Sequence, residues 1–438
     1  MPTLRGVQNG TSLNGRKNAI LWATMARLSE SEIRDIVKLL EAGKPLPDDY
    51  RFKLFDHNRE VELIWNGKTN ETESVALPFQ TIEIVDEPRA DKTGRAQLDL
   101  FDYDNRGRQI KGWTNKLIWG DNKYILSSLK NGPLRQEIDE NGGIKLIYID
   151  PPFDVGADFS MDIEVGGETL IKKPSVLEEI AYRDTWGKGA DSFISMIYER
   201  LSLMHDLLAD DGSIYVHCDW RMSGNLRLVL DEIFGPSNFL NEIIWSYEGT
   251  QSPSPKKLAS KHDTIYRYAS NKDKIQLRKS HIEQEINPKT YTSFFQDDKG
   301  YYRIQGLGDY SEASIRKFDE EGRIYYSGKG TKYLKHYFRQ KDGKIFKDKK
   351  LSDVWSDITQ LGTSMQKEKL DYPTQKPERL IQRIIETDTV KSDIVADFFM
   401  GSGTTMAVAE KLGRKWIGSD LGKFSIHTAR KRQPLYPC

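Results

Sequence analysis

The sequence is poor in cysteine, and it has neither long apolar runs nor a net charge. Cys218 and Cys438 are the only cysteines among 438 residues, too few for a disulfide framework or a zinc site, so we expect no metal. No apolar run approaches the roughly 20 residues that span a membrane, and the N-terminal residues lack the apolar core of a signal peptide. We therefore expect a globular, cytoplasmic protein with no membrane partner.

The net charge of zero conceals an uneven distribution. Residues 251–350 contain 23 Lys+Arg and 13 Asp+Glu, a local net charge of +10, so the remaining residues sum to −10. One basic segment within an otherwise acidic chain indicates a face that binds a polyanion. A solvated, lysine-rich loop region explains the charge alone equally well.

The first 110 residues form an N-terminal module whose role the sequence does not show. Residues 15–45 have apolar residues at helical spacing, with Ser29 as a candidate N-cap and Gly43 as a stop signal. Residues 50–86 alternate more like strands, at 61–65 and 81–85, and a polar linker follows.

From about residue 115, strands alternate with helices, which is typical of a parallel sheet covered on both faces. Residues 275–360 interrupt this pattern with a basic, aromatic segment, and the polar, Gly-rich segment 156–189 is expected to be a mobile loop that closes on substrate. The expected strands are 117–119, 144–149, 213–217, 242–245, 264–268, 394–396 and 416–419, and the expected helices are 123–130, 192–208, 225–234, 377–387 and 402–412.

The tetrapeptide Asp150-Pro151-Pro152-Phe153 ends the apolar strand 144–149, at the edge where open parallel sheets bind ligands. The Asp150 carboxylate and the Pro151 carbonyl could accept the two N–H groups of an exocyclic amine, which concentrates electron density on a poorly nucleophilic nitrogen. Two prolines stiffen the turn, and Phe153 offers a flat face for an extruded base. For the tetrapeptide alone, a Pro-Pro turn with a core phenylalanine is an equally good explanation.

A second motif spans residues 393–405: a strand, a Gly-x-Gly turn at Gly401 and Gly403, and a helix beginning near Ser402. Glycine lets a ligand approach the backbone closely, and a helix N-terminus favours a negative group. Asp420 ends the next strand 17 residues after Gly403, where a nucleotide-binding βαβ unit places its acceptor for a ribose hydroxyl. A dinucleotide-binding dehydrogenase is the rival hypothesis, but the third glycine of that fingerprint is missing.

Together these segments resemble the beta class of DNA amino-methyltransferases, and within it the modification subunits of type III restriction systems and their solitary relatives. Members carry DPP(Y/F), then a target-recognition region, then F-x-G-S-G-T-T. This chain has DPPF at 150–153, the basic insert, and FMGSGTT at 399–405. The segment 372–377 resembles the class's (H/Y)PTQKP, and 118–122 resembles its G-D segment. The resemblance covers about residues 115–270 and 350–430.

The resemblance implies an α/β, Rossmann-like S-adenosylmethionine-dependent methyltransferase fold with a mostly parallel sheet, permuted motif order and an inserted basic target-recognition region. Residues 111–270 would form the catalytic half, 271–360 the insert and 361–438 the cofactor-binding half. Two departures from the class pattern are Phe398, where proline is frequent, and Met400, where a small residue is usual.

The resemblance also assigns the site residues. Thr374, Lys376 and Pro377 would line the methionine side of the cofactor, and Asp121 would approach its adenine. The catalytic residues would be Asp150, Pro151, Pro152 and Phe153, and the cofactor-binding residues Asp121, Thr374, Lys376, Pro377, Asp397, Phe399, Gly401, Ser402, Gly403, Thr404, Thr405 and Asp420. Candidates for phosphate contacts are Lys256, Lys257, Arg303, Arg316, Lys317 and Arg323, with aromatics between them that either stack or form a small core.

The expected activity is site-specific methyl transfer from S-adenosylmethionine to adenine N6 of a flipped-out base in double-stranded DNA. N4-cytosine methylation follows the same chemical logic, and Asp150 favours adenine because the cytosine class more often has serine there. A catalytically idle DNA-binding subunit is the alternative from another class, although Asp150, Gly401 and Gly403 are intact. A homodimer and a restriction (helicase/nuclease) subunit are possible partners. Because no GxxxxGK(S/T) loop occurs, ATP-driven translocation would need another chain.

Overall fold

The structure is a computed structural model that divides into two units, residues 1–64 and 65–438, each described by itself. The residues that it describes are 30–43, 63–69, 71–82, 113–152, 161–165, 168–172, 190–247, 256, 258–287, 294–361, 368–370, 372 and 374–432. Within these residues no helix is both long and apolar enough to cross a membrane.

In the first unit, helix α2 spans Glu30–Glu41. Gly43 follows it with a φ of +63°, and its N–H donates to the Leu40 carbonyl at 3.0 Å, so the expected stop is confirmed. Ser29 and the earlier part of the expected helix lie outside the described residues. The strands expected at 61–65 and 81–85 are wrong as far as the structure describes them, because 63–65 and 81–82 form no strand.

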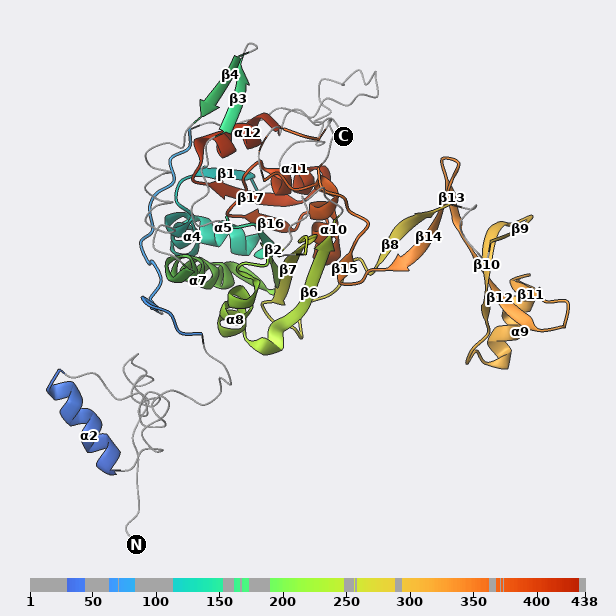
Figure 1. Ribbon diagram of the computed structural model, residues 1–438, viewed down its shortest axis with the longest axis horizontal. Coiled ribbons are helices and arrows are strands. Elements are labelled where there is room, and N and C mark those ends of the chain that lie inside the picture. The colour runs from blue at the N-terminus through green and yellow to red at the C-terminus, as the bar shows by residue number, and fades with distance from the viewer. Residues whose placement is uncertain are drawn as a thin grey trace, which may run out of the picture. The chain divides into compact units, whose positions relative to one another are not determined.

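The second unit is built on an eight-stranded sheet with the order β1-β17-β16-β2-β5-β7-β6-β15 (Figure 1). Strand β7 runs antiparallel to β5 and β6, and every other neighbouring pair is parallel, so the mostly parallel sheet is confirmed. The strands are β1 Lys116–Trp119, β2 Ile144–Ile149, β5 Leu208–Cys218, β6 Phe239–Ser246, β7 His262–Ala269, β15 Val354–Trp355, β16 Ile394–Asp397 and β17 Lys415–Asp420.

Helices cover both faces of this sheet (Figure 1). On one face α4 packs on α7 and α7 on α8, and on the other α11 packs between α10 and α12. The helices are α4 Asn122–Asn131, α5 Leu134–Glu140, α7 Ala190–Leu207, α8 Ser223–Phe234, the short 3-10 helix η1 Pro236–Asn238, α10 Glu378–Asp388, α11 Thr404–Lys411 and α12 Lys423–Arg432.

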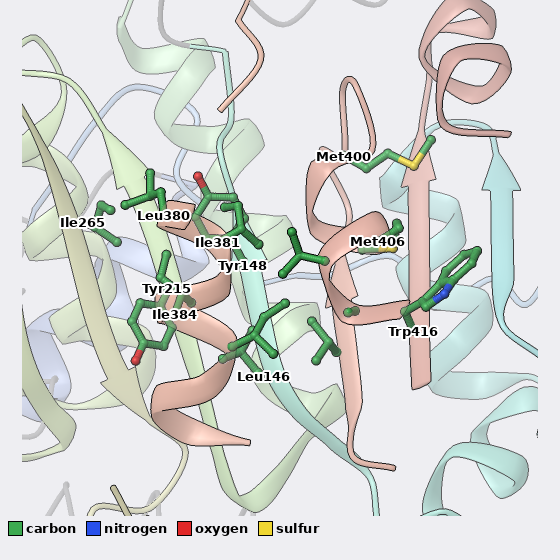
Figure 2. Close-up of a cluster of buried hydrophobic side chains, with 14 of the residues drawn as sticks. Leu146, Tyr148, Tyr215, Ile265, Leu380, Ile381, Ile384, Met400, Met406 and Trp416 are labelled. Atoms are coloured by element: carbon green, nitrogen blue, oxygen red, sulfur yellow. The ribbon is translucent and has the colours of Figure 1, made fainter. Parts of the chain in front are cut away.

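The core under α10 fixes the central strands. Figure 2 shows Leu380, Ile381 and Ile384 of α10 beside Leu146 and Tyr215 of the sheet. All five side chains are almost fully buried, because α10 repeats its apolar residues at helical spacing and helices cover both faces of β2 and β5. Burying each large apolar side chain stabilises the fold by about 1.5–3 kcal/mol. This packing holds β2 and β5 in place, and with them the residues at their carboxyl ends.

The segment 65–82 lies along helices α4, α7 and α8, which cover one face of the sheet. The Trp65 indole N–H donates to Ser195 Oγ of α7 at 2.7 Å, and Lys68 pairs with Glu232 of α8 at 2.8 Å. The Ser127 hydroxyl of α4 donates to the Val75 carbonyl at 2.8 Å. This segment therefore belongs to the second unit, whereas the sequence assigned it to a module ending near residue 110.

The basic insert folds as two small antiparallel sheets, β11-β12-β10-β9 and β13-β14-β8, with helix α9. A small core of Ile286, Phe338 and Ile345 packs against Phe294 and Tyr301, so these aromatics are structural. The elements are β8 His281–Ile286, β9 Phe295–Asp297, β10 Gly300–Gly306, α9 Glu312–Glu320, β11 Ile324–Tyr326, β12 Lys332–Tyr337, β13 Arg339–Lys341 and β14 Lys344–Lys350.

Two boundaries differ from the sequence-based expectation. The chain leaves the insert before residue 360, since β15 already pairs with β6 in the large sheet. The segment expected to be a loop at 156–189 contains a hairpin, β3 Met161–Val165 and β4 Glu168–Lys172. The loop prediction is therefore wrong for these two strands, and the alternation of apolar and polar residues in Met161–Val165 is a strand signal that the prediction missed.

Candidate active site

Four neighbouring parallel strands lead to aspartates at one edge of the large sheet. Asp420 and Asp397 end β17 and β16, Asp150 follows β2 directly, and Asp121 lies two residues after β1. The sheet order β1-β17-β16-β2 makes these strands consecutive. Because the carboxyl ends of parallel strands share an edge, segments more than 250 residues apart meet in one place.

Asp150 lies opposite a lysine from the other half of the domain. Its Oδ2 accepts a hydrogen bond from Lys376 Nζ at 2.5 Å, and the two side chains are only 16% and 19% exposed. Pro151 is buried and Pro152 is partly buried, which leaves the turn little freedom. The structure thus brings Asp150, Pro151 and Lys376 together, whereas Phe153 lies outside the described residues.

Asp397 is fully enclosed. It accepts hydrogen bonds from the Thr405 hydroxyl at 2.6 Å and from the Phe399 N–H at 3.0 Å. Burial, together with the charges of Asp150 and Asp420, outweighs these hydrogen bonds and raises the pKa of Asp397 to about 7. The Asp397 side chain is 2% exposed, and its hydrogen bonds to Phe399 and Thr405 stabilise the glycine loop from the protein interior.

Glycine is required at the two positions of the loop for different structural reasons. Both adopt positive φ, +50° at Gly401 and +75° at Gly403, which favours glycine. The Gly401 N–H donates to Asp420 Oδ2 at 2.9 Å. A Cβ on Gly403 would lie 2.7 Å from Cβ of Ala429 in α12. The close approach that requires glycine at 403 is therefore to a helix of the protein itself.

The loop hydroxyls also point inward. Ser402 Oγ lies 3.1 Å from Thr404 Oγ1, and the Thr404 hydroxyl donates to the Lys376 carbonyl at 3.3 Å. Arg432 Nη1 donates to Thr404 Oγ1 at 3.0 Å. Both hydroxyl side chains are buried, so they tie the loop to the segment that carries Lys376.

Asp420 and Asp121 are oriented by backbone N–H groups. Asp420 Oδ1 accepts from the Gly422 N–H at 2.8 Å. Asp121 Oδ1 caps helix α4 by accepting from the Lys123 N–H at 2.9 Å, and it pairs with Arg200 at 2.8 Å. Each carboxylate oxygen can accept more than one hydrogen bond, so both groups suit a hydroxyl or amine donor.

The remaining residues assigned to the cofactor surround this edge. Thr374 is exposed, Pro377 is buried directly before α10, and Phe399 is partly exposed. The Asn122 amide donates to the Phe398 carbonyl at 2.9 Å, which joins the G-D segment to the loop. Met400 and Phe398, the departures from the class pattern, are core side chains.

A polar chain beneath Asp150 was not predicted from sequence. Tyr148 Oη lies 3.0 Å from His217 Nδ1, and His217 Nε2 lies 3.1 Å from Asp263 Oδ2. The Tyr247 hydroxyl donates to Asp263 Oδ1 at 3.0 Å. Burial raises the pKa of Tyr148 well above its usual value, so its proton stays in the network. The only sequence signal was the position of His217 near a strand end.

The candidate phosphate contacts are not brought to one point. Arg303 lies across from His336 in the β10–β12 pair, and burial together with the charges of Arg303 and Arg323 lowers the pKa of His336. Arg316 and Lys317 are exposed on α9, where Arg316 pairs with Glu312 at 3.5 Å. Of the two remaining candidates, Lys256 is exposed and Lys257 is outside the described residues.

Known proteins match most of the chain. A family model described as DNA methylase matches residues 144–431. The chain is 29% identical over 355 residues to Type II methyltransferase M.EcaI of Enterobacter cloacae, covering 73% of this chain and 69% of that protein. It is 28% identical over 354 residues to the type III restriction-modification enzyme StyLTI Mod subunit of Salmonella typhimurium, covering 68% and 51%. It is 24% identical over 317 residues to DNA adenine methyltransferase YhdJ of Escherichia coli, covering 72% and 81%.

The match to the family model includes both sequence motifs and the strands that carry them. The chain spans about half the length of the type III subunit and more of the other two relatives. Since the family model covers more than half of the chain, from β2 to α12, the chain belongs to the DNA methylase family.

Proposed function

We propose that this chain transfers a methyl group from S-adenosylmethionine to adenine N6 in double-stranded DNA, within a restriction-modification system or as a solitary enzyme. The observation that carries the proposal is the Asp150 carboxylate directly after β2, with the Pro151 carbonyl beside it and the glycine loop at the same edge. The relatives are named as a type II methyltransferase, a Mod subunit of a type III restriction-modification enzyme and a DNA adenine methyltransferase, which supports the same activity.

The chemistry of this edge fits S-adenosylmethionine. The cofactor carries a positive sulfonium and ammonium and no phosphate, and the edge is lined by the carboxylates of Asp121, Asp150 and Asp420. Asp420, held by two backbone N–H groups, would accept the ribose hydroxyls, and Asp121 would meet the adenine. The loop 401–405, with Thr374 and Pro377, would hold the methionine part. When bound, the cofactor supplies an electrophilic methyl group.

Asp150 and Pro151 prepare the target nitrogen. Lys376 occupies Oδ2 of Asp150, which leaves Oδ1 and the Pro151 carbonyl to accept the two N–H groups of an exocyclic amine. Holding both N–H groups turns the amine so that its lone pair is directed out of the ring's conjugation. The buried Pro151 and the rigid Pro-Pro turn fix these acceptors before substrate arrives, so little reorganisation is needed.

The proposal is tested by identifying the methylated base. The protein is incubated with labelled S-adenosylmethionine and mixed-sequence duplex DNA, which is then digested to nucleosides. Label in N6-methyladenine is expected. Label in N4-methylcytosine would instead identify the protein as an N4-cytosine methyltransferase, because the same acceptor pair can bind the exocyclic amine of cytosine. Absence of label from DNA, with DNA binding retained, would identify an idle binding subunit.

Asp150→Ala tests the catalytic assignment. We expect transfer to fall at least ~1,000-fold, because an electrostatic acceptor in a partly buried site is lost. The cofactor Kd, measured by calorimetry, should change only a few-fold. The matched control is Asp210→Ala, an aspartate on β5 whose side chain is 78% exposed, and it should behave as wild type. Full activity in Asp150→Ala would refute the assignment.

The partners are part of the proposal. The basic insert would contact DNA phosphates through Lys256, Lys257, Arg303, Arg316, Lys317 and Arg323. A homodimer would carry two active sites, and a separate helicase/nuclease subunit would provide restriction, as the name of the type III relative suggests. Light scattering of the purified protein with and without DNA checks the homodimer, and a single monomeric mass in both states would contradict it.

A further inference from the structure

Lys376 contacts both motifs of the site at once. Its ammonium donates to Asp150 Oδ2 at 2.5 Å, and its carbonyl accepts from the Thr404 hydroxyl at 3.3 Å. The first partner belongs to the catalytic turn and the second to the glycine loop, and the resemblance alone had placed Lys376 against the cofactor. We propose that Lys376 is a positioning residue that orients the Asp150 carboxylate and couples it to the glycine loop. This inference rests on the proposed function.

The ammonium contact sets the orientation of the carboxylate. A carboxylate on a short side chain rotates about its Cβ–Cγ bond, so its free oxygen is poorly placed unless the other is anchored. Lys376 anchors Oδ2, and since both side chains are at least four-fifths buried, water screens this attraction weakly. Oδ1 is thereby left in a fixed place beside the Pro151 carbonyl, which a two-point acceptor requires.

The surrounding charges explain why a cation is needed here. Asp150 faces Asp397 at the end of β16 and Tyr148 on β2, and Asp263 and His217 lie beneath them on β7 and β5. Asp397 and Asp420 repel further negative charge at this edge. Lys376 supplies the positive charge that compensates Asp150, and its field also reaches Asp263.

The backbone of Lys376 is held firmly enough to transmit a shift of the loop. Glu378, two residues later, pairs with Arg432 of α12 at 2.8 Å and with Lys411 of α11 at 2.5 Å. Arg432 also donates to Thr404 Oγ1, so the segment, the loop and two helices form one network. Any rearrangement of residues 401–405 on loading of the site therefore moves Lys376 and, through it, Asp150.

The test separates positioning from cofactor binding. Lys376→Met keeps most of the unbranched side chain and removes its charge, and Lys376→Arg keeps the charge. We expect kcat of Lys376→Met to fall about 100-fold with the S-adenosylmethionine Kd within about threefold of wild type. Lys376→Arg should recover at least a tenth of the wild-type kcat. Lys391→Met, an exposed lysine after α10, is the matched control and should be unchanged.

The opposite split would overturn the inference. If the cofactor Kd of Lys376→Met rises about 100-fold while kcat at saturation stays near wild type, Lys376 is a cofactor ligand. A double-mutant cycle on thermal unfolding with Asp150→Asn tests the ion pair without catalysis, and additive effects would also contradict it. If the wild-type protein transfers no methyl group, the proposed function fails, while the cycle still decides whether the pair exists.

Discussion

A buried ion pair in the domain of the large sheet and an exposed ion pair of the basic insert hold their charges in opposite ways. In the domain of the large sheet, the side chains of Arg267 on β7 and Asp388 at the end of α10 are 8% and 0% exposed. In the insert, those of Arg316 and Glu312 are 79% and 90% exposed. A buried charge has few alternative partners, whereas an exposed one is solvated and screened by salt. The buried pair therefore holds its atoms in place, and under the proposed function the exposed charges of the insert would contact DNA phosphates.

The largest effect is expected for the buried pair. Asp388 accepts hydrogen bonds from Ser213 Oγ at 2.6 Å, from the Tyr215 hydroxyl at 2.9 Å and from two nitrogens of Arg267. Asp388→Ala leaves the Arg267 charge buried without compensation, which should destabilise the fold by about 3–5 kcal/mol. Urea denaturation measures this loss. Asp388→Asn, which keeps one acceptor, should lose less, and equal stability of Asp388→Ala and wild type would contradict the reasoning.

A second effect follows from the pKa of Asp397. An aspartate whose pKa is raised from 3.8 to about 7 holds its proton more tightly in the folded state. Its contribution to stability is therefore present below about pH 4 and is lost as the pH rises through 7. The difference corresponds to at most ~4 kcal/mol. We expect the free energy of unfolding to fall across this range.

Asp397→Asn isolates this contribution. The variant loses one of the two hydrogen bonds that Asp397 accepts, so its absolute stability is lower, but its stability should depend less on pH between 4 and 7. Asp139→Asn on α5, whose side chain is 52% exposed, is the control and should keep the wild-type slope. Identical slopes in wild type and Asp397→Asn would show that Asp397 titrates normally.

How much of the fold and of the site can be predicted from the sequence depends on the same contrast between buried and exposed segments. The strands at 144–149 and 394–396 were predicted because they are short apolar runs, and the helix at 377–387 because its apolar residues recur at helical spacing. The sequence also placed Asp150 and Asp420 at strand ends, and the structure adds that these strands are separated only by β16. No local pattern reveals that order, since chain neighbours in such a sheet need not be spatial neighbours.

Long-range contacts were beyond the sequence for a physical reason. Lys376 and Asp150 are 226 residues apart, and no local sequence pattern near either residue predicts their contact. Gly403 was expected to make room for a ligand, yet its close neighbour is Ala429 of α12. The strand β15 has only two residues, too few for alternation to appear.

In the insert, single charges should have smaller effects. Arg303→Ala or Arg323→Ala should weaken DNA binding a few-fold and lower the dependence of log K on log salt by about 1, without changing sequence preference. Fluorescence anisotropy at several salt concentrations measures both quantities. Lys274→Ala, a lysine of the turn after β7, is the control. An unchanged salt slope for both arginine variants would remove them from the DNA interface.

The smallest effect is expected for the exposed pair of α9. Glu312 and Arg316 are one helical turn apart and 3.5 Å from each other, and solvent screens both. Glu312→Ala should change the free energy of unfolding by no more than ~0.5 kcal/mol, about a tenth of the loss expected for Asp388→Ala. It also removes a negative charge beside Arg316, so DNA binding should tighten slightly at low salt, and the gain should disappear at high salt as screening removes it. A loss of stability comparable to that of Asp388→Ala would show that exposure does not distinguish the two regions.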